Sequence, residues 1–396
     1  MIELELQGEY VMDFFCRRND GLGFREVKNN AVTSDLFIPA DLKEFLKESS
    51  RVSWNNLLKR SEYNGNEQKL IRDIMDDIRR KIETSANVAI FLNSTTKNKP
   101  YSFGGETLKL LYVSGTELRG DEDFEKNIFS AVEEMTYSFH HEGKRIFAFR
   151  PDLSFFINGI FLGYAELKSN FTNQTAKNNG RNKVITDYLE AVWEYTKIAN
   201  GNDVQQSLRR TMLRPFEKSI HLVTTDINNT YILRNPGQFF DDAKKGFQEN
   251  MISISSFRPV VEKVFKPLPT VLDENADPRI RFEEAMRSLY SKKMVEKEIL
   301  YYNFMAYTYK TITVTENGRK VQKKEYKDKT GKLMCPRPKQ KFGCDRIIDR
   351  VQEFLDHESE PNYYIEKLRA ELVAMNAPYN PQIQISAESE TKRSIF

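Results

Sequence analysis

The sequence predicts an α/β fold in which a mixed sheet is flanked by helices, and three observations carry this prediction. Between residues 126 and 168, β-forming residues are frequent and apolar and polar residues alternate, which is typical of strands. Helical spacing of apolar residues marks segments on both sides of this region. Strand-forming residues then return at SIHLVTTD and NTYILRN. Strands enclosed by helices along one chain indicate a sheet with helices packed against it.

The flanking helices are expected at 3–18, 65–84 and about 181–200. The first two carry apolar stripes, formed by Leu4, Tyr10, Val11, Phe14 and Phe15 in one and by Leu70, Ile71, Ile74 and Ile78 in the other. In the second helix, acidic and basic residues alternate on the remaining face. This pattern indicates a helix that packs on a core and leaves a charged face in solvent.

The strands between these helices are expected to pair as hairpins. His140–Gly143 separates IFSAVEEMTYSF from KRIFAF, and Asn158–Gly159 separates PDLSFFI from IFLGYAELK. An Asn-Gly dipeptide between two strands is the strongest short-range signal for a two-residue turn. Because LSFFI and IFLGYA are almost wholly apolar, we expect these two strands to be buried on both faces.

A domain boundary is expected at 257–278, a segment that holds four prolines and little periodicity. A helical pattern follows over 280–310, then a hairpin that turns at Asn317–Gly318, then a further helical pattern over 345–375. The expected domains are therefore the sheet domain at 1–255, a helical linker with a β-hairpin at 256–335, and a last part at 336–396.

Composition excludes several classes of protein. The chain has three cysteines, with no CxxC motif, and four histidines, which argues against a disulfide framework and a structural zinc site. The formal net charge of +3 is close to balance, so any argument for nucleic acid must come from local patches. The sequence has no run of eighteen apolar residues that could form a membrane span, and we expect a cytoplasmic protein.

The hairpin at 151–168 carries the residues that point to chemistry. Asp152 and Glu166 are carboxylates of the kind that holds Mg²⁺, and the backbone carbonyl of Leu167 offers a third oxygen. Lys168 follows Glu166 by two residues, so it lies on the same strand face about 7 Å further along. A metal-activated water and a lysine near the developing charge are what phosphodiester hydrolysis needs.

The register of this hairpin tests the assignment. If Asn158–Gly159 were a strict two-residue turn between regular strands, Asp152 would pair with Ala165 and would face away from Glu166. The two carboxylates converge only if a bulge or a longer loop shifts the register by one residue. The sequence therefore predicts an irregularity between residues 151 and 166.

The string FRPDLSFFINGIFLGYAELKSN resembles the nuclease motif of the motor/nuclease (R) subunits of type I restriction enzymes. That family reads RPD, an apolar strand with Asn-Gly, and a second apolar strand that ends in ELK and Asn. The matching residues are Arg150, Pro151, Asp152, Phe156, Asn158, Gly159, Glu166, Leu167, Lys168 and Asn170.

The resemblance implies a PD-(D/E)xK (restriction-endonuclease-like) domain over 1–255 that uses Mg²⁺ to cleave double-stranded DNA. Asp152 and Glu166 would bind the metal, and Lys168 would be the catalytic lysine. The implied partners are double-stranded DNA and the modification and specificity subunits of a restriction complex. Those subunits, or a region beyond this chain, would read the DNA sequence.

Two further residues follow from the resemblance. The family carries a Gln-x-x-x-Tyr motif on the helix after the ELK strand, and its tyrosine would be Tyr188, although Val184 stands at the glutamine position. Such folds often place a glutamate of the first helix near the metal. Glu9 is the candidate and Glu5 the alternative, and an exposed helix acid explains either equally well.

The segment LMCPRPKQKFGCDRIIDRV resembles the one that precedes the ATP site of the family's motor, with Gln340 at the position that contacts adenine. Residues 336–396 would then be the N-terminal edge of a RecA-like ATPase domain. No GxxxxGK[ST] loop occurs, so we expect ATP binding only in a full-length motor and a chain truncated before that loop. An ordinary polar residue at a helix start is the alternative for Gln340.

Two questions stay open in the sequence. The basic run at 319–341 either follows DNA phosphates or is a hairpin whose charged edge prevents strand pairing, and we favour the second. The alternatives to a double-strand nuclease are a nuclease for single strands, RNA or modified DNA, and a catalytically silent interaction or DNA-docking module of the same complex.

Overall fold

The computed structural model describes most of the chain, and the fold below refers to these residues alone. They are 9–97, 100–114, 124–141, 143–168, 174–181, 183, 190, 214–226, 228–242, 264–270, 272, 276–316, 319–327, 331–357, 359–360, 362–364 and 366–367. The chain forms two compact units, Met1–Pro338 and Lys339–Phe396. In the second unit the main element is the greater part of α14 (Pro338–Asp356).

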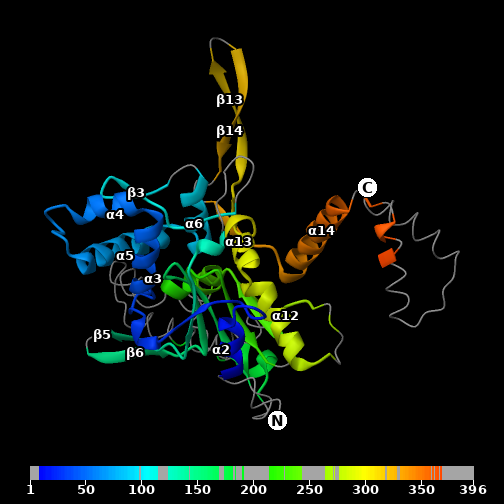
Figure 1. Ribbon diagram of the computed structural model, residues 1–396. Helices are drawn as coiled ribbons and strands as arrows, with labels where there is room; N and C mark the ends of the chain where they lie inside the picture. The colour runs from blue at the N-terminus through cyan, green and yellow to red at the C-terminus, as the bar shows by residue number, and fades with distance from the viewer. Residues whose placement is uncertain are drawn as a thin grey trace, which may run out of the picture. The chain divides into compact units, whose positions relative to one another are not determined.

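A mixed seven-stranded sheet organises the first unit (Figure 1). Its order is β1 (Arg25–Val27), β4 (Phe129–Glu133), β7 (Leu153–Ile157), β8 (Ile160–Leu167), β9 (His221–Thr225), β10 (Thr230–Arg234) and β11 (Lys266–Pro267). The pairs β1–β4 and β8–β9 are parallel, and the other neighbours are antiparallel. The predicted α/β class with a mixed sheet and flanking helices is therefore confirmed.

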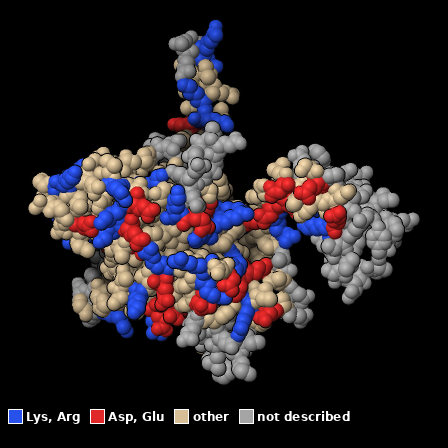
Figure 2. All heavy atoms as spheres, in the orientation of Figure 1, with Lys and Arg blue, Asp and Glu red and all other residues tan. Residues whose placement is uncertain are grey.

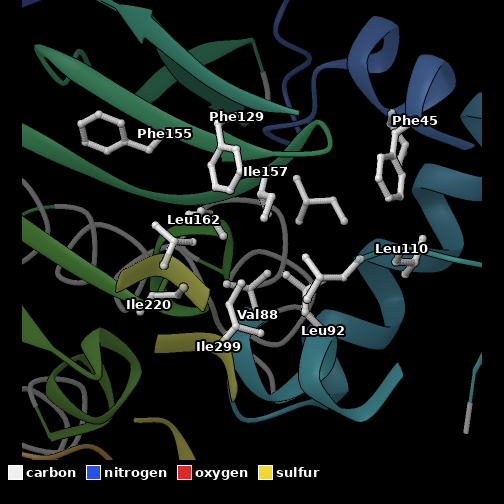
Figure 3. Close-up of a cluster of buried hydrophobic side chains, with 14 of the residues drawn as sticks. Phe45, Val88, Leu92, Leu110, Phe129, Phe155, Ile157, Leu162, Ile220 and Ile299 are labelled. Carbon is white, nitrogen blue, oxygen red and sulfur yellow. The ribbon is translucent and has the colours of Figure 1, made fainter. Parts of the chain in front are cut away.

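Helices cover one face of this sheet and form the larger core with it (Figure 3). Phe155 and Leu162 of the sheet pack in the same cluster as Val88 of α6 and Ile299 of α13. The helices of this layer are α2 (Glu9–Cys16), α3 (Pro39–Ser49), α4 (Arg51–Leu58), α5 (Glu67–Thr84), α6 (Val88–Lys97), α12 (Pro278–Tyr290) and α13 (Lys292–Leu300). The segment after the expected boundary at 257–278 therefore adds helices to the same core.

The opposite face carries a smaller core under shorter elements. A separate hairpin of β5 (Tyr137–His141) and β6 (Lys144–Phe149) packs there with a π-helical turn at Ala176–Gly180 and with α9 (Arg214–Glu217). Phe216 of α9 lies 5.5 Å from Phe149, measured between ring centroids, and 6.2 Å from Tyr164. Both faces of the central strands are thus covered, as their apolar sequences predicted.

The remaining elements are short or stand apart from the sheet. They are η1 (Asn29–Ala31), η2 (Phe124–Lys126), and the two-stranded pairs β2 (Tyr101–Phe103) with β3 (Glu106–Leu108), β12 (Phe304–Ala306) with β15 (Lys332–Met334), and β13 (Tyr309–Glu316) with β14 (Arg319–Tyr326). Among the described residues, no helix is long and apolar enough to cross a membrane.

The Asn158–Gly159 turn is anchored by the core beneath it. Both residues have a positive φ, +50° and +76°, as a type I′ turn requires. The Asn158 side chain accepts from the amide of Ile128 at 2.8 Å and donates to the carbonyl of Leu110 at 2.9 Å. A Cβ on Gly159 would lie 2.4 Å from the carbonyl oxygen of Ile38, so only glycine fits. These contacts fix the start of β8.

Several predicted elements match and others do not. The helix expected at 65–84 is α5, and SIHLVTTD and NTYILRN form the antiparallel pair β9–β10. The single strand expected at IFSAVEEMTYSF (128–139) is a wrong prediction, because Glu134 has a φ of +46° and the segment is divided there into β4 and β5. The helix expected over 280–310 is interrupted at Ser291 and ends at Leu300, before β12.

Other elements were not predicted or lie outside the described residues. The sequence reading missed α3, α4 and α6. Residues 3–8 of the first expected helix, most of 181–200, and the turn at 317–318 are outside the described part. The helix expected at 345–375 begins earlier, at Pro338, and is described as far as Asp356.

Candidate active site

A one-residue bulge in the β7–β8 hairpin brings the predicted site to one face of the sheet. The register between the two strands shifts at Phe155–Phe156, so that Leu153, and not Asp152, pairs with Ala165. Asp152 therefore lies level with Glu166 and on the same face. The irregularity that the sequence predicted in this hairpin is confirmed.

The two cores show the same bulge independently. Phe161 and Tyr164 are three residues apart, yet both belong to the smaller core, whereas a regular strand would send them to opposite faces. The bulged strand must approach β9 closely at Gly163. A Cβ there would lie 2.4 Å from the carbonyl oxygen of His221, so glycine is required by space.

Asp152 is fixed by backbone contacts at the start of β7. Its Oδ2 accepts a hydrogen bond from the amide of Leu167 at 2.6 Å. Its carbonyl accepts from the amide of Glu134 at 2.9 Å. The Asp152 carboxylate thus reaches the end of β8, at the residue between Glu166 and Lys168.

Glu166 is a wholly buried carboxylate, with 0% of its surface exposed. Its Oε1 accepts from Nζ of Lys168 at 2.6 Å and from Nζ of Lys183. Its Oε2 is buried and has no hydrogen-bond partner among the described residues. A buried carboxylate oxygen without a partner is costly, so this atom is a place for a cation or a donor from a ligand.

The two lysines on Glu166 differ in their surroundings. The Lys168 side chain is 9% exposed and that of Lys183 is 41% exposed. Lys168 is enclosed by the π-helical turn, because a Cβ on Gly180 would lie 3.2 Å from its Cγ and 1.9 Å from Oγ1 of Thr224. Lys168 is therefore the fixed cation of the pair, and solvent reaches Lys183.

The π-helical turn that encloses Lys168 is held at its N-terminal end. Oγ1 of Thr175 accepts from the amide of Asn178 at 3.1 Å, and the amide of Ala176 donates to Oδ2 of Asp226 at 2.7 Å. Asp226 directly follows β9, so the turn is attached to the strand beside Glu166. This attachment leaves little freedom for the groups around Glu166.

The electrostatics of the site centre on Asp152. Burial, and after it the charge of Glu166, raise the pKa of its carboxyl to about 6, although the Leu167 amide, Lys183 and Lys168 act to lower it. When two carboxylates lie close together and are shielded from water, the negative charge of each disfavours the ionisation of the other. A divalent cation between them would remove that repulsion.

The residues present fit a hard divalent metal with few protein ligands. The described part of the chain holds no group of three or more His, Cys, Asp or Glu side chains that could bind a metal. Asp152 and Glu166 form a pair of carboxylates, and Mg²⁺ binds through one or two carboxylates while it keeps several waters. The orphaned Oε2 of Glu166 offers a free lone pair to such an ion.

The other predicted site residues have mixed outcomes. The Leu167 amide contacts Asp152, and the role of its carbonyl stays a prediction. The backbone of Glu9 begins α2, but its side chain, Glu5 and Tyr188 all lie outside the described residues. Gln340 is an exposed residue in the first turn of α14.

Two further glutamates lie near Asp152. Glu133 ends β4, and Glu134 forms an exposed ion pair with Arg150 at 3.5 Å. Lys183 is the contact that sequence reasoning missed, because its spacing of 17 residues from Glu166 forms no local pattern. The signal that could have found it is a lysine on the helix expected directly after the ELK strand.

Comparison with known families identifies the family of this chain. The chain matches the family described as Type I restriction enzyme R protein N terminus over residues 27–236, which is more than half of its 396 residues. The match includes Asp152, Glu166 and Lys168 together with the strands that carry them. A comparison with curated protein sequences finds no significant match. The chain therefore belongs to the family of type I restriction enzyme R protein N termini.

Proposed function

We propose that this chain is the Mg²⁺-dependent endonuclease part of a type I-like restriction enzyme and that it cleaves double-stranded DNA. The observation that carries the proposal is the bulge in the β7–β8 hairpin. It puts Asp152, Glu166 and Lys168 on one face, which a regular hairpin would not do. This arrangement supports a PD-(D/E)xK-type site, and so does the family assignment.

Each residue of the site has a role that its surroundings support. Asp152 and Glu166 would hold the metal, with the Leu167 carbonyl as a further oxygen ligand. When bound, Mg²⁺ polarises a phosphoryl oxygen and lowers the pKa of a coordinated water. Lys168 is held against Glu166 and would orient the attacking water or neutralise the charge that develops on the phosphate.

The site in this chain is already charge-balanced, which favours one alternative. Two ammonium groups contact Oε1 of Glu166, so the carboxylates have counter-charges without a metal. A catalytically silent module that keeps these residues for stability, and docks DNA or the other subunits of a restriction complex, would have the same contacts. Metal binding separates the two functions.

The first experiment is a calorimetric titration of Mn²⁺ into the full chain at neutral pH. We expect one or two equivalents to bind to the wild type and none of that binding to remain in Asp152→Ala. Glu134→Gln is the matched control, because it removes an exposed carboxylate whose backbone adjoins Asp152 and should leave the titration unchanged. Equal binding in the wild type and Asp152→Ala would remove Asp152 from the mechanism.

The reaction itself needs a second measurement. Supercoiled and linear duplex DNA should be cut by the complete restriction complex with Mg²⁺, and the Lys168→Met complex should bind DNA but not cut it. Competition with single-stranded DNA and RNA of the same length tests the substrate. Preferential cleavage of either competitor would replace the proposed substrate, and cleavage by the Lys168→Met complex would exclude the catalytic lysine.

A further inference from the structure

The β13–β14 hairpin is an antiparallel ribbon whose two faces have different chemistry. In the register of the pair, Thr311 lies opposite Lys324, Thr313 opposite Gln322 and Thr315 opposite Lys320. Residues directly opposite each other share a face, so these side chains form one continuous surface. We name it the threonine–lysine face; its members are Thr311, Thr313, Thr315, Lys320, Gln322 and Lys324.

The opposite face of the ribbon holds its aliphatic side chains. Ile312 and Val314 are half-buried, and they share this face with Val321. Lys310 and Glu325 form an ion pair there at 2.9 Å. The aliphatic side chains hold the ribbon together on this side. Lys323, and Arg319 opposite Glu316, lie on this face too, so here the basic residues are interspersed with acids.

The threonine–lysine face is basic and unneutralised. All six of these side chains are exposed and none is acidic. The same face continues at the base of the ribbon with the exposed pair Tyr309 and Tyr326. Lys320 and Lys324 have no ion pair with any described carboxylate, and threonines stand opposite both. Figure 2 shows Lys and Arg side chains along this ribbon. If the charges served only to prevent pairing with another strand, there would be no reason for one face of the ribbon to lack acids.

We propose that the threonine–lysine face binds the phosphate backbone of duplex DNA, an inference that rests on the proposed function for its choice of substrate. A two-stranded ribbon fits the major groove of B-DNA, which is about 12 Å wide. Lys320 and Lys324 are four residues apart, about 14 Å along an extended strand, so they reach separate phosphates. Threonine hydroxyls donate to phosphate oxygens, as is common in DNA complexes.

The marginal stability expected of an isolated ribbon supports a role in binding. The pair β13–β14 belongs to no larger sheet, and an isolated two-stranded hairpin is marginally stable in water. Contact with a duplex would order the ribbon and release counterions from the DNA. The interaction would be independent of sequence, because it uses phosphates and not base edges.

The test measures DNA binding of the full 396-residue chain without cleavage. The probe is a 30-base-pair duplex with a fluorescent end label, in EDTA, and anisotropy is followed between 50 and 200 mM salt. Lys320→Gln/Lys324→Gln removes two charges from the threonine–lysine face. Lys310→Gln/Lys323→Gln removes two charges from the other face and is the matched control, since the net charge is the same.

The wild type should bind the duplex and weaken steeply with salt. Loss of two phosphate contacts should reduce the slope of log affinity against log salt by about 1.8 in Lys320→Gln/Lys324→Gln. The rise from 50 to 200 mM salt should then weaken DNA binding by a factor that is about tenfold smaller in this variant than in the wild type. The control should keep most of the slope. Equal slopes in the two variants, or a wild type that does not bind duplex DNA at 50 mM salt, would overturn the proposal, as would face-dependent binding that prefers single-stranded DNA.

The outcome is separable from that of the nuclease proposal. Lys320→Gln/Lys324→Gln should bind Mn²⁺ as the wild type does, because its substitutions lie outside the carboxylate site. A chain with face-dependent DNA binding and no Asp152-dependent metal binding would keep this inference and reject the nuclease. The reverse result would reject the ribbon as a DNA contact and keep the nuclease.

Discussion

At Asp152 the protein holds a carboxyl whose proton leaves only near neutral pH. Burial and the charge of Glu166 raise its pKa to about 6. Because a metal binds the ionised carboxylate, protons compete with Mn²⁺ below that value. We expect the Mn²⁺ affinity of the wild type to be constant above pH 7 and to fall about tenfold per unit below pH 6. Calorimetry from pH 5 to 8 checks this; an affinity that does not fall between pH 6 and pH 5 would mean that Asp152 titrates as an ordinary carboxyl.

The same shift predicts a change in folding stability, with a defined sign. The folded-state pKa of Asp152 is above its ordinary value of 3.8, so the native state holds this proton more tightly than the unfolded chain does. Between pH 4 and 6 the contribution of Asp152 to the free energy of unfolding therefore falls as pH rises, by roughly 3 kcal/mol at most. Asp152→Asn should lack this fall in urea titrations across the window, and an identical pH profile would contradict the shift.

The two lysines on Glu166 should contribute unequally to stability. Lys168 is enclosed and Lys183 is 41% exposed, so water can replace Lys183 more easily. We expect Lys168→Met to lower the free energy of unfolding by about 3 kcal/mol and Lys183→Met by less than about 1 kcal/mol. A double-mutant cycle with Glu166→Gln is the control, since both effects should shrink when the buried charge is absent. Equal losses would mean that exposure does not govern the pair.

Among the elements, the bulged strand β8 sets the geometry of the site, and Gly163 is the residue that permits it. A Cβ at this position would meet a backbone carbonyl of β9 at 2.4 Å, and backbone cannot rotate away. We expect Gly163→Ala to cost about 2–3 kcal/mol and to reduce Mn²⁺ binding, because β8 and β9 must separate beside Glu166. Urea unfolding and the Mn²⁺ titration measure the two effects.

A matched glycine substitution provides the control for that prediction. Gly343 lies within α14, and a Cβ there would have open space around it. Gly343→Ala should therefore stabilise its own helix by up to about 1 kcal/mol. A Gly163→Ala protein as stable as the wild type would show that β8 and β9 can move apart at no cost, and the bulge would not be a constraint.

How far the sequence predicts an element depends on whether its cause is local. The turn at Asn158–Gly159 and the helix α5 follow from residues within each segment, and both were predicted. The bulge was predicted for a different reason, since the chemistry required Asp152 and Glu166 to share a face. Its position at Phe155–Phe156 could not be read, because a bulge is fixed by the approach of β9 at Gly163, which is distant in sequence.

The elements that were missed have non-local causes. Glu134 divides an apparently continuous strand through a positive φ, which no periodicity reveals. The α13 helix ends at Leu300 although the helical pattern continues, because the next residues pair with β15. At the site, Lys183 contacts Glu166 across a separation of 17 residues, and no motif links the two positions. Sequence patterns therefore gave the chemical groups, and tertiary contacts determine their partners.

At the scale of the whole chain, a buried ion pair joins the sheet to the helices that follow it. Arg234 of β10 donates through both terminal nitrogens to the carboxylate of Glu298 on α13, one of these contacts being 3.1 Å long. Asn303 donates to the Glu298 carbonyl at 2.9 Å, and Asn87 of the segment before α6 donates to Asn303 at 2.9 Å. Segments on both sides of the expected boundary at 257–278 thus share one polar network.

This network predicts that the sheet and the helices after it unfold together. Arg234→Met leaves Glu298 buried without its guanidinium, and removing one partner of a buried pair costs about 3–5 kcal/mol. Arg234→Met/Glu298→Met should recover most of that loss, because no charge is then left in the core. Hydrogen exchange should show that β8 and α13 lose protection by the same amount in the single variant. If α13 lost protection while β8 kept it, residues 256–335 would be a linker that unfolds apart from the sheet domain, in line with the expected boundary, and the candidate site would not depend on them.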